Sequence, residues 1–462
     1  MARQDKGLTR RQMLAGSGAA IASVGVVSLG TADQGEPLSW DQETDILVVG
    51  SGVGASTAAI TAHENGDGVI LVEKAGFAGG TSSKSAGVLW IPNNFSLRKK
   101  GIKDKKDDCV RYQARFSYPE RYDPGDPMLG LSRHEFSLLE AFYDNATAAV
   151  DSLRNNKSLN VAEWRMFFLD RPATDYLDHV SENKVPAGRA LGPIQADGNM
   201  GLGTELMAQL GAALAKRNLP TLLNHRAVGL LRDADGRVIG VRAESEGKSI
   251  NLRARKAVIF ATGGYVHNQE MINKFQPARL YGSCAMPAAE GDFINIAAEA
   301  GAQLGNIGGA WRTQILLEDA LHSRYLNTGV FFPPGDSAIQ VNKYGLRAVD
   351  ENRNYNDRTE VHGLYDAVNA EYPNQLMFMI YDQRTAQAFA GDYPLPAENA
   401  EAPHVLSGAS LEELVTKIGA RLEEIKTHTG GLSLASEFVS NLESTIERFN
   451  QFAESGVDKD FQ

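Results

Sequence analysis

Residues 45–81 read DILVVGSGVGASTAAITAHENGDGVILVEKAGFAGGT. The stretch begins with a continuous apolar run, Ile46–Val49, which is typical of a strand buried on both faces of a parallel sheet. A glycine-rich segment follows, then small helix-compatible residues over 56–64, and then a second apolar run, Val69–Val72. The pattern predicts a strand, a tight turn, a helix and a second strand.

The glycine-rich segment has the spacing of a dinucleotide-binding turn. We expect Gly50 to make the turn, Gly52 to let a pyrophosphate approach the backbone, and Ala55, after Gly54, to let the helix pack closely on the sheet. N–H groups at the start of the helix favour phosphate, and Glu73, 23 residues after Gly50, is placed to accept ribose hydroxyls. The alternative is a glycine-rich turn in an ordinary α/β domain.

The composition excludes several classes of protein. A chain of 462 residues suits two or three domains, and 43% hydrophobic with 22% charged residues is an ordinary globular balance. The net charge of −11 argues against a nucleic-acid partner. The only two cysteines, Cys109 and Cys284, cannot form a disulfide framework or a CxxC site, and the histidines show no HExxH spacing. We therefore expect no bound metal.

The N-terminus is similar to a twin-arginine export signal. Arg10 and Arg11 precede an uncharged run, rich in Gly, Ala and Ser, that extends to Gly30. The run is too weakly apolar for a stable membrane span. We expect residues 1–43 to be the leader of a protein that is exported after folding. The alternative is a leader that stays on a cytoplasmic protein, and in both cases it lies outside the folded domains.

A hydroxyl-rich loop follows the second apolar run. Residues 74–94 read KAGFAGGTSSKSAGVLWIPNN. Together with the first glycine turn, this stretch resembles the superfamily of FAD-dependent fumarate reductases and 3-ketosteroid dehydrogenases, and the WIPNN ending favours the ketosteroid branch. The resemblance implies FAD as the cofactor, contacted in this loop by Lys74, Gly80, Thr81, Ser82, Ala86 and Gly87.

Two further segments extend the resemblance. Residues 95–202 mix charged and amphipathic stretches and predict a mostly helical insert. Apolar runs separated by D-G and E-G pairs then predict a β-meander, which ends in ATGG at residues 261–264. This ending resembles a second superfamily signature, whose turn packs beneath the dinucleotide. It implies that Ala261, Thr262 and Gly263 contact FAD and that Val228 lies beside the adenine.

These segments predict an α/β fold with a Rossmann-like FAD-binding domain over residues 44–310, which includes the helical insert and the meander. From about Trp311 the sequence becomes richer in aromatic residues and proline, which predicts a second, α+β substrate domain over 311–455. Residues 456–462 resemble the start of a return to the first domain. The relatives continue with a glycine-rich turn and a final helix that this sequence lacks, and we therefore expect it to be a fragment.

The second domain carries the catalytic prediction. Residues 341–351, VNKYGLRAVDE, resemble the superfamily segment VNxxGxRFxNE. Eight residues after its arginine, fumarate reductases have an arginine and ketosteroid dehydrogenases have a tyrosine; here that residue is Tyr355. The resemblance also implies a role for Tyr176, in an Asp-Tyr pair. Unperturbed tyrosine is protonated at neutral pH, and Arg353 or Arg358 could supply the field that Tyr355 needs to act as a base. The alternative is a loop tyrosine beside arginines that pair with neighbouring carboxylates.

Three functions remain open at this point. The first is a flavin-dependent dehydrogenase that removes hydrogens next to the carbonyl of a bulky apolar ketone, with an unknown electron acceptor as its second partner. The second is a reductase of an unsaturated carboxylate such as fumarate or urocanate. The third is a truncated, inactive flavoprotein. The sequence does not fix the oligomeric state.

Overall fold

The computed structural model describes residues 39–166, 171–327 and 333–461. The chain divides into two units, residues 1–40 and 41–462, and everything below concerns the second. The predicted export signal lies outside the described residues, so export stays a prediction. Within the described residues, no helix is long and apolar enough to cross a membrane.

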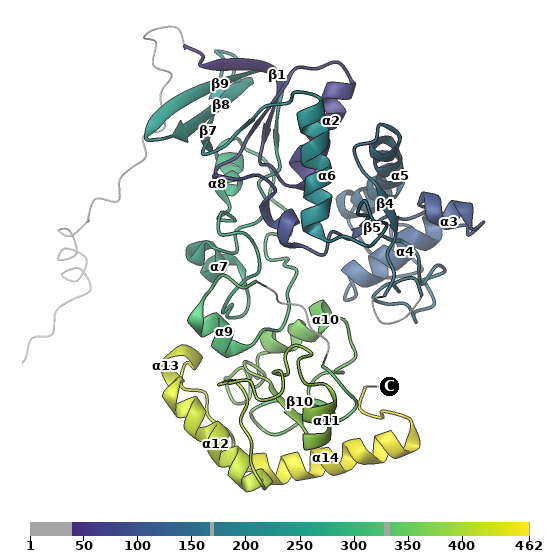
Figure 1. The fold of residues 1–462 in the computed structure, drawn as a ribbon, viewed down its shortest axis with the longest axis vertical. Helices are drawn as coiled ribbons and strands as arrows, with labels where there is room; N and C mark the ends of the chain where they lie inside the picture. Colours follow the sequence, from purple (N-terminus) through teal and green to yellow (C-terminus); the bar gives the residue numbers. More distant parts are fainter. Residues whose placement is uncertain (1–38, 167–170, 328–332, 462) are drawn as a thin grey trace, which may run out of the picture. The chain divides into compact units, whose positions relative to one another are not determined.

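The central sheet has six strands in the order β6-β2-β1-β9-β8-β7 (Figure 1). Strand β1 pairs in parallel with β2 on one side and with β9 on the other. Strands β7, β8 and β9 form the predicted antiparallel meander. The strand bounds are β1 Gln42–Val49, β2 Val69–Val72, β6 Thr221–Leu222, β7 Arg226–Arg232, β8 Val238–Ser245 and β9 Lys248–Phe260.

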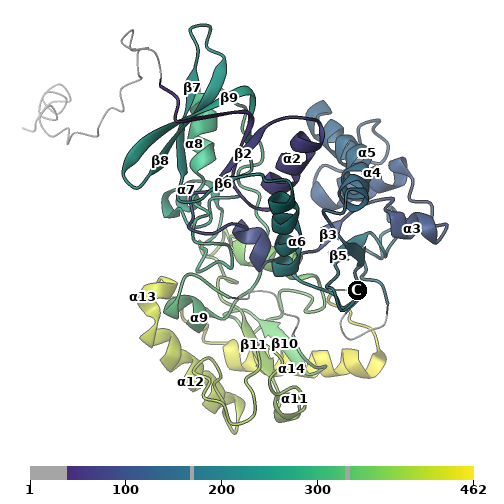
Figure 2. The same ribbon diagram turned by 45° about the horizontal axis from the view of Figure 1, so that its top comes forward.

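The apolar run of β1 is continuous because both faces of the strand are covered. Ile46 and Val48 pack in one hydrophobic cluster with helices α2 (Val53–Glu64) and α6 (Gly203–Lys216). Leu47 and Val49 belong to a second cluster, formed with the meander and helix α8 (Asp292–Glu299). Helices α2 and α6 lie side by side in both ribbon views (Figures 1 and 2). Each such buried aliphatic side chain stabilises the fold by roughly 1.5–3 kcal/mol.

Helices occupy only the first part of the predicted helical insert, as α3 Phe95–Lys99, α4 Lys106–Ser117 and α5 Arg133–Asn155. The later part contains a small antiparallel sheet instead, in which β5 (Ala190–Pro193) lies between β3 (Leu89–Trp90) and β4 (Val161–Glu163). The 3-10 helix η1 (Gly80–Lys84) lies in the hydroxyl-rich loop before β3.

A fully buried arginine organises that later part of the insert. Arg189 donates two hydrogen bonds of 2.8 Å to the carboxylate of Asp104 and one of 2.5 Å to Asp175. Asp175 also accepts a hydrogen bond from the indole of Trp90. Burial raises the pKa of Asp175, and Arg189 opposes that rise. Buried charges persist only when they are paired, so these long-range contacts, rather than helical periodicity, fix this segment.

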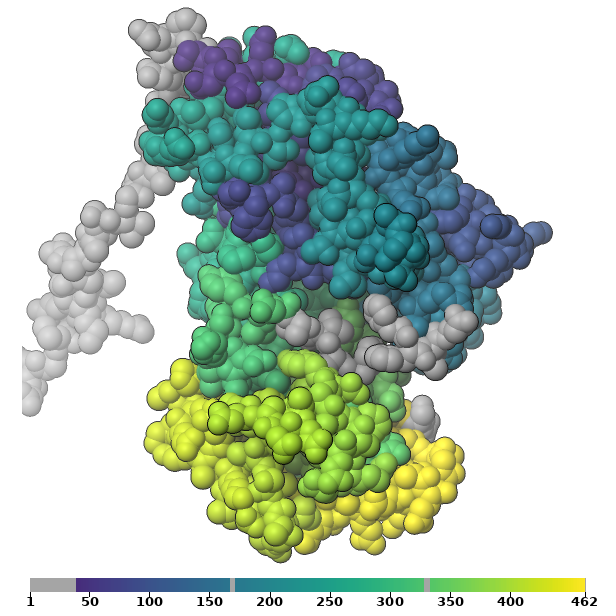
Figure 3. All heavy atoms as spheres, viewed as in Figure 1, coloured from purple at the N-terminus to yellow at the C-terminus, as the bar shows by residue number. Residues whose placement is uncertain are grey.

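The remaining chain contains the antiparallel strand pair β10–β11 and the helices packed around it. Ile339 and Val341 in β10 pack against Phe438 and Leu442 of α14. In the space-filling view the green-to-yellow residues occupy a region distinct from the purple-to-teal residues (Figure 3). The elements are α7 Gln269–Phe275, α9 Leu317–His322, β10 Ala338–Val341, α10 Tyr355–Thr359, η2 Glu360–Gly363, β11 Phe378–Tyr381, α11 Gln383–Ala388, α12 Leu411–Glu424, α13 Lys426–Thr429 and α14 Phe438–Ser455.

We predict that Gly50→Ala destabilises the protein by at least about 2 kcal/mol, because φ is +112° there and a Cβ atom would lie 2.3 Å from the carbonyl oxygen of Ala261. The matched control is Gly211→Ala, in the middle of α6, where a Cβ atom meets nothing within 4 Å. That change should leave stability unchanged or raise it by up to about 1 kcal/mol. Urea unfolding of the two variants measures the difference, and equal midpoints would contradict the role assigned to Gly50.

Candidate active site

A cavity of about 350 Å³ lies where β1, β2 and β9 end. It is formed by the first glycine turn, the hydroxyl-rich loop, the end of β9 and the start of α8. Most of the residues predicted to bind FAD line it: Gly50, Gly52, Gly54, Glu73, Lys74, Gly80, Thr81, Ser82, Ala261, Thr262 and Gly263.

The floor of this cavity is bare backbone. A Cβ atom at Gly52 would lie 3.2 Å from the hydroxyl of Ser82, which is closer than most real contacts. A side chain at this position would therefore take up space in the cavity. The N–H of Val53 donates to that same hydroxyl at 3.1 Å, which joins the start of α2 to the second loop. Nothing lies within 4 Å of a Cβ atom built on Gly263. Exposed backbone at a helix N-terminus suits a pyrophosphate.

Hydrogen bonds orient the carboxylate of Glu73 as expected for a residue that binds the ribose. Its two carboxylate oxygens accept hydrogen bonds from the hydroxyl of Ser51, at 2.6 Å, and from the N–H of Ala75, at 2.8 Å. The hydroxyl of Ser51 in turn accepts from the N–H of Gly79 at 3.0 Å. Each carboxylate oxygen keeps a free lone pair for a ribose hydroxyl. These residues therefore fit the adenosine and pyrophosphate parts of FAD.

Lys74 is not a free cation at this site. Its ammonium lies 2.6 Å from Asp292 and 2.8 Å from Glu290. Burial raises the pKa of Asp292, but hydrogen bonds from Lys74 and Arg226 outweigh that effect and hold it below the usual value. The stabilisation from this ionised carboxylate is thus present at neutral pH and is lost as the pH falls through the lowered pKa. Lys74 consequently joins α8 to the end of β2.

Four residues predicted to bind FAD do not line the cavity: Ala55, Ala86, Gly87 and Val228. Ala55 is fully buried in α2, where it packs in the cluster beneath the sheet. Ala86 is exposed, and Gly87 packs against the backbone of residues 202–203. Val228 is half-buried in β7. The residues of this segment that line the cavity are His225 and Ala227.

Thirteen residues of the cavity wall were not among the predicted FAD contacts. Most of them belong to the meander and to the segment around α8, which have no short signature in the sequence. They are Val49, Ser51, Val53, Val72, His225, Ala227, Phe260, Met286, Ala288, Ala289, Asp292, Phe293 and Ile296.

The two predicted catalytic tyrosines meet in one aromatic cluster, although 179 positions separate them in the sequence. The ring centroids of Tyr176 and Tyr355 are 6.0 Å apart, with an interplanar angle of 82°. Trp311 completes the cluster: its ring stacks on Tyr176 at 5.7 Å, and its indole N–H donates a 2.7 Å hydrogen bond to the hydroxyl of Tyr355. Phe116 of α4 also packs against Tyr176, with ring centroids 6.1 Å apart. The predictions did not assign Trp311 to the site.

The surroundings of Tyr176 keep its hydroxyl protonated. Burial raises the pKa of Tyr176 far above its usual value, and the neighbouring Tyr355 raises it further. Tyr176 therefore stays a neutral phenol, with its ring packed edge-on against the ring of Tyr355.

Two arginines close to Tyr355 in the sequence pair with carboxylates, and a third is buried. Arg358, one turn further along α10, is 0% exposed; burial lowers its pKa to about 10, against the opposing effect of Glu351 and Asp350. Arg353 lies 3.9 Å from Asp350. The arginine of the superfamily segment, Arg347, pairs with Glu351 at 2.6 Å. These contacts indicate mainly structural roles for Arg347 and Arg353.

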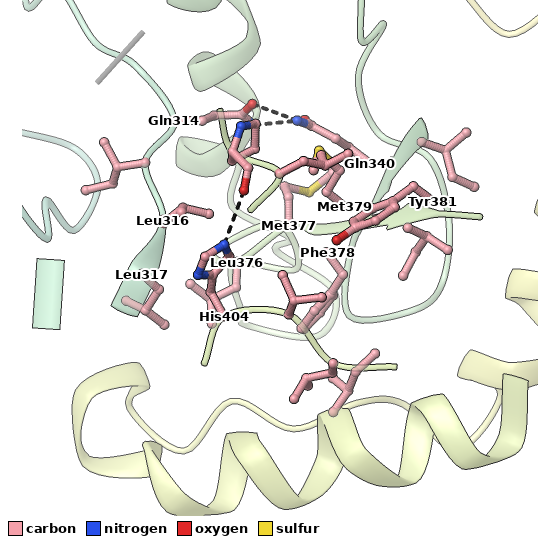
Figure 4. Close-up of a pocket in the computed structure, with 18 of the residues that line it drawn as sticks. Gln314, Leu316, Leu317, Gln340, Leu376, Met377, Phe378, Met379, Tyr381 and His404 are labelled. Atoms are coloured by element: carbon pink, nitrogen blue, oxygen red, sulfur yellow. Dashed lines mark hydrogen bonds between the residues drawn. The ribbon is translucent and has the colours of Figure 1, made fainter. Parts of the chain in front are cut away.

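A second, larger cavity of about 1140 Å³ lies between β11, the 314–317 loop and the apolar faces of α12 and α14 (Figure 4). Gln314 and Gln340 exchange two side-chain hydrogen bonds at its edge, and His404 contacts the carbonyl oxygen of Pro394. Of the described residues that line this cavity, none belongs to the aromatic cluster. The two tyrosines therefore lie outside this second cavity.

The sheet order, the glycine turn and the acceptor at Glu73 define a dinucleotide-binding flavoprotein. The comparison with known families agrees: residues 45–462 match the FAD binding domain family, and the chain belongs to that family. FAD is the cofactor, and the protein is an FAD-dependent oxidoreductase of the ketosteroid dehydrogenase and fumarate reductase type.

Two relatives and one solved structure illustrate the similarity. The chain is 30% identical over 453 residues to 4-oxocyclohexanecarboxylate 2-dehydrogenase of Sinomonas cyclohexanicum, with 90% of this chain and 75% of that protein aligned. It is 28% identical to 3-oxosteroid 1-dehydrogenase of Mycolicibacterium smegmatis, over 91% of this chain and 79% of that one. The fold is similar to that of 3-ketosteroid Δ1-dehydrogenase from Sterolibacterium denitrificans, with a TM-score of 0.70, 22% identity, and 91% and 81% of the two chains covered.

We predict that Glu73→Ala raises the dissociation constant for FAD by about tenfold to a hundredfold, because a charged acceptor for the ribose is lost. Titration of the apoprotein with FAD, followed by flavin fluorescence, measures the constant. The control is Glu64→Ala, which removes an exposed carboxylate at the end of α2 that pairs with Arg217 outside the cavity. Equal affinities for the two variants would contradict the assignment of Glu73.

Proposed function

We propose that the protein dehydrogenates a cyclic ketone at the carbon–carbon bond next to its carbonyl group. The single observation that carries this proposal is the cluster of Tyr355, Tyr176 and Trp311, in which the oxygen of Tyr355 accepts a 2.7 Å hydrogen bond from an uncharged donor. Both relatives described above are named for substrates that are cyclic ketones. The shared chemistry of those names supports the substrate class.

The proposed reaction divides between the cofactor and this cluster. Bound FAD supplies a hydride acceptor. The oxygen of Tyr355 takes the proton from the carbon next to the carbonyl, where the substrate's own carbonyl group makes the proton acidic. Tyr355 must be deprotonated before this step and becomes a neutral phenol when the proton arrives, while Tyr176 keeps its own proton throughout. The aromatic rings provide an apolar wall for the substrate.

The charges around the cluster favour a neutral substrate. A dicarboxylate needs a cation that is free to bind it in a bidentate manner. Arg312 instead pairs with Glu360 at 2.9 Å and also donates to Gln276 at 2.9 Å. Arg353 pairs with Asp350. A ketone has no such requirement, because one weak hydrogen-bond donor suffices for its carbonyl oxygen.

Reduction of an unsaturated carboxylate is the second candidate, and one observation favours it. The ion pair of Arg353 is long, at 3.9 Å, and its side chain is 39% exposed. A side chain held this weakly can turn from Asp350 to a carboxylate substrate or donate a proton to it. The third candidate, an inactive flavoprotein that does not hold FAD, is tested by the visible spectrum of the purified protein, because a stoichiometric flavin band would exclude it.

Anaerobic mixing of the FAD-loaded protein with substrates separates the two candidates. We expect 4-oxocyclohexanecarboxylate or a 3-oxosteroid to bleach the oxidised flavin band, and fumarate to be inert with a reduced viologen dye as electron donor. Fumarate turnover without any bleaching by ketones would overturn the ketone proposal in favour of the reductase.

We predict that Tyr355→Phe lowers the rate constant of flavin bleaching by about 10²–10⁴, the usual contribution of a positioned base. FAD affinity should not change, since Tyr355 does not line the dinucleotide cavity. The control is Tyr344→Phe, which removes a hydroxyl that donates to Glu371 elsewhere in the second domain. Bleaching at the parent rate in Tyr355→Phe would exclude this tyrosine as the base.

A further inference from the structure

Trp311 makes a contact whose direction is fixed by chemistry. The indole N–H is a donor only and keeps its proton at every accessible pH, so the 2.7 Å bond places the oxygen of Tyr355 in the acceptor role. Such a bond strengthens as the acceptor oxygen gains negative charge. It therefore stabilises the deprotonated form of Tyr355 more than the protonated form.

The backbone on both sides of this bond is tied together. The N–H of Arg312, the residue after Trp311, donates to the side-chain oxygen of Asn356, the residue after Tyr355, at 2.9 Å. The guanidinium of Arg312 reaches Glu360 at the end of the same helical turn. Asn354 caps α10 by accepting from the N–H groups that follow Tyr355. The indole and the phenol thus have little freedom to separate.

Trp311 is 61% exposed, which is unusual for so large an apolar side chain. A tryptophan that served only as packing would bury its ring, whereas this ring has one face on Tyr176 and its N–H on Tyr355. Its exposed surface and its single polar contact are both explained if it borders a substrate and holds the group that reacts.

We propose that Trp311 is a positioning residue, whose indole N–H holds the oxygen of Tyr355 ready to accept a proton. The inference rests on the proposed function and deepens it, because it names the uncharged group that stabilises the deprotonated tyrosine in place of a cation.

The charged and titratable groups around the cluster do not supply this stabilisation. On its own helix, Tyr355 is followed by Asp357, whose pKa is raised by burial. Arg312, from the facing loop, is paired with Glu360. On the side of Tyr176, the neighbouring α4 contributes Tyr112, whose pKa burial raises above its usual range. The remaining nearby charges are the Arg353–Asp350 pair and Arg358, on which Glu351 and Asp350 act.

The test replaces the indole by a ring without an N–H. In Trp311→Phe, tyrosine labelled with ¹³C at Cζ reports ionisation by NMR, and the resonance that disappears in Tyr355→Phe identifies Tyr355. We expect the pH midpoint of this resonance to rise by about one to two units in Trp311→Phe, as the loss of one hydrogen bond to a charged group requires. This readout needs neither substrate nor flavin.

The kinetic readout is the pH profile of ketone-dependent flavin bleaching. In Trp311→Phe the acid limb should move up by the same one to two units and the rate at pH 7 should fall about tenfold to a hundredfold, while the KM for the ketone stays within about twofold. A purely structural role would lower the rate equally at all pH values. That result, with an unmoved NMR midpoint, would overturn the inference.

A double-mutant comparison keeps the test sharp even if a single variant loses stability. If Trp311 acts through Tyr355, then Trp311→Phe has no further effect on the rate in a Tyr355→Phe background. Additive losses would contradict the inference. A shifted NMR midpoint without bleaching by any ketone would sustain the role of Trp311 toward Tyr355 and refute the proposed reaction instead.

Discussion

The parallel pairing of β1 on both of its edges is the constraint on which the cofactor site depends. Val49, the last residue of β1, lies opposite Val72 of β2 and opposite Phe260 of β9. The three strands therefore end together, and the segments that follow them must converge at one edge of the sheet. Gly50 is required there, since its Cα lies against the carbonyl of Ala261 and leaves no room for a side chain. The acceptor Glu73 reaches the same edge from β2.

This part of the fold could be predicted because its information is local. The two apolar runs, the glycine spacing and the ATGG ending each lie within a few residues, and periodicity with turn chemistry is enough to read them. The last part of the predicted meander is one long strand, β9, which pairs with β8 at its start and with β1 over residues 252–260. The later part of the insert could not be read in this way. Its order depends on Arg189, whose partners Asp104 and Asp175 lie 85 and 14 positions away.

The residues that we propose for catalysis show the same difference. Tyr355 was found by its register to a motif, and that motif is a structural turn: Gly345 has φ +76° and packs on α14, and Arg347 is tied to Glu351 and Asp458. Helix α10 starts at Tyr355, eight residues after Arg347, and this spacing was the basis of the prediction. Trp311 has no such signal, because its hydrogen bond spans 44 positions and a single tryptophan in a loop has no periodicity. Only the folded chain shows which oxygen its N–H meets.

An uncharged donor suits a ketone better than an arginine does. A guanidinium beside Tyr355 would also stabilise its deprotonated oxygen, but it would attract carboxylates, and its own desolvation would be costly at an apolar wall. The chain instead ties Arg312 and Arg353 to Glu360 and Asp350, and the hydrogen bond to the oxygen of Tyr355 comes from an indole. The indole is neutral in every step of the proposed reaction, so it can stabilise the deprotonated oxygen of Tyr355 without placing a cation beside the substrate. The negative charge of that oxygen disappears when it accepts the proton, and under the proposal the same side chain therefore serves both the base and a neutral substrate.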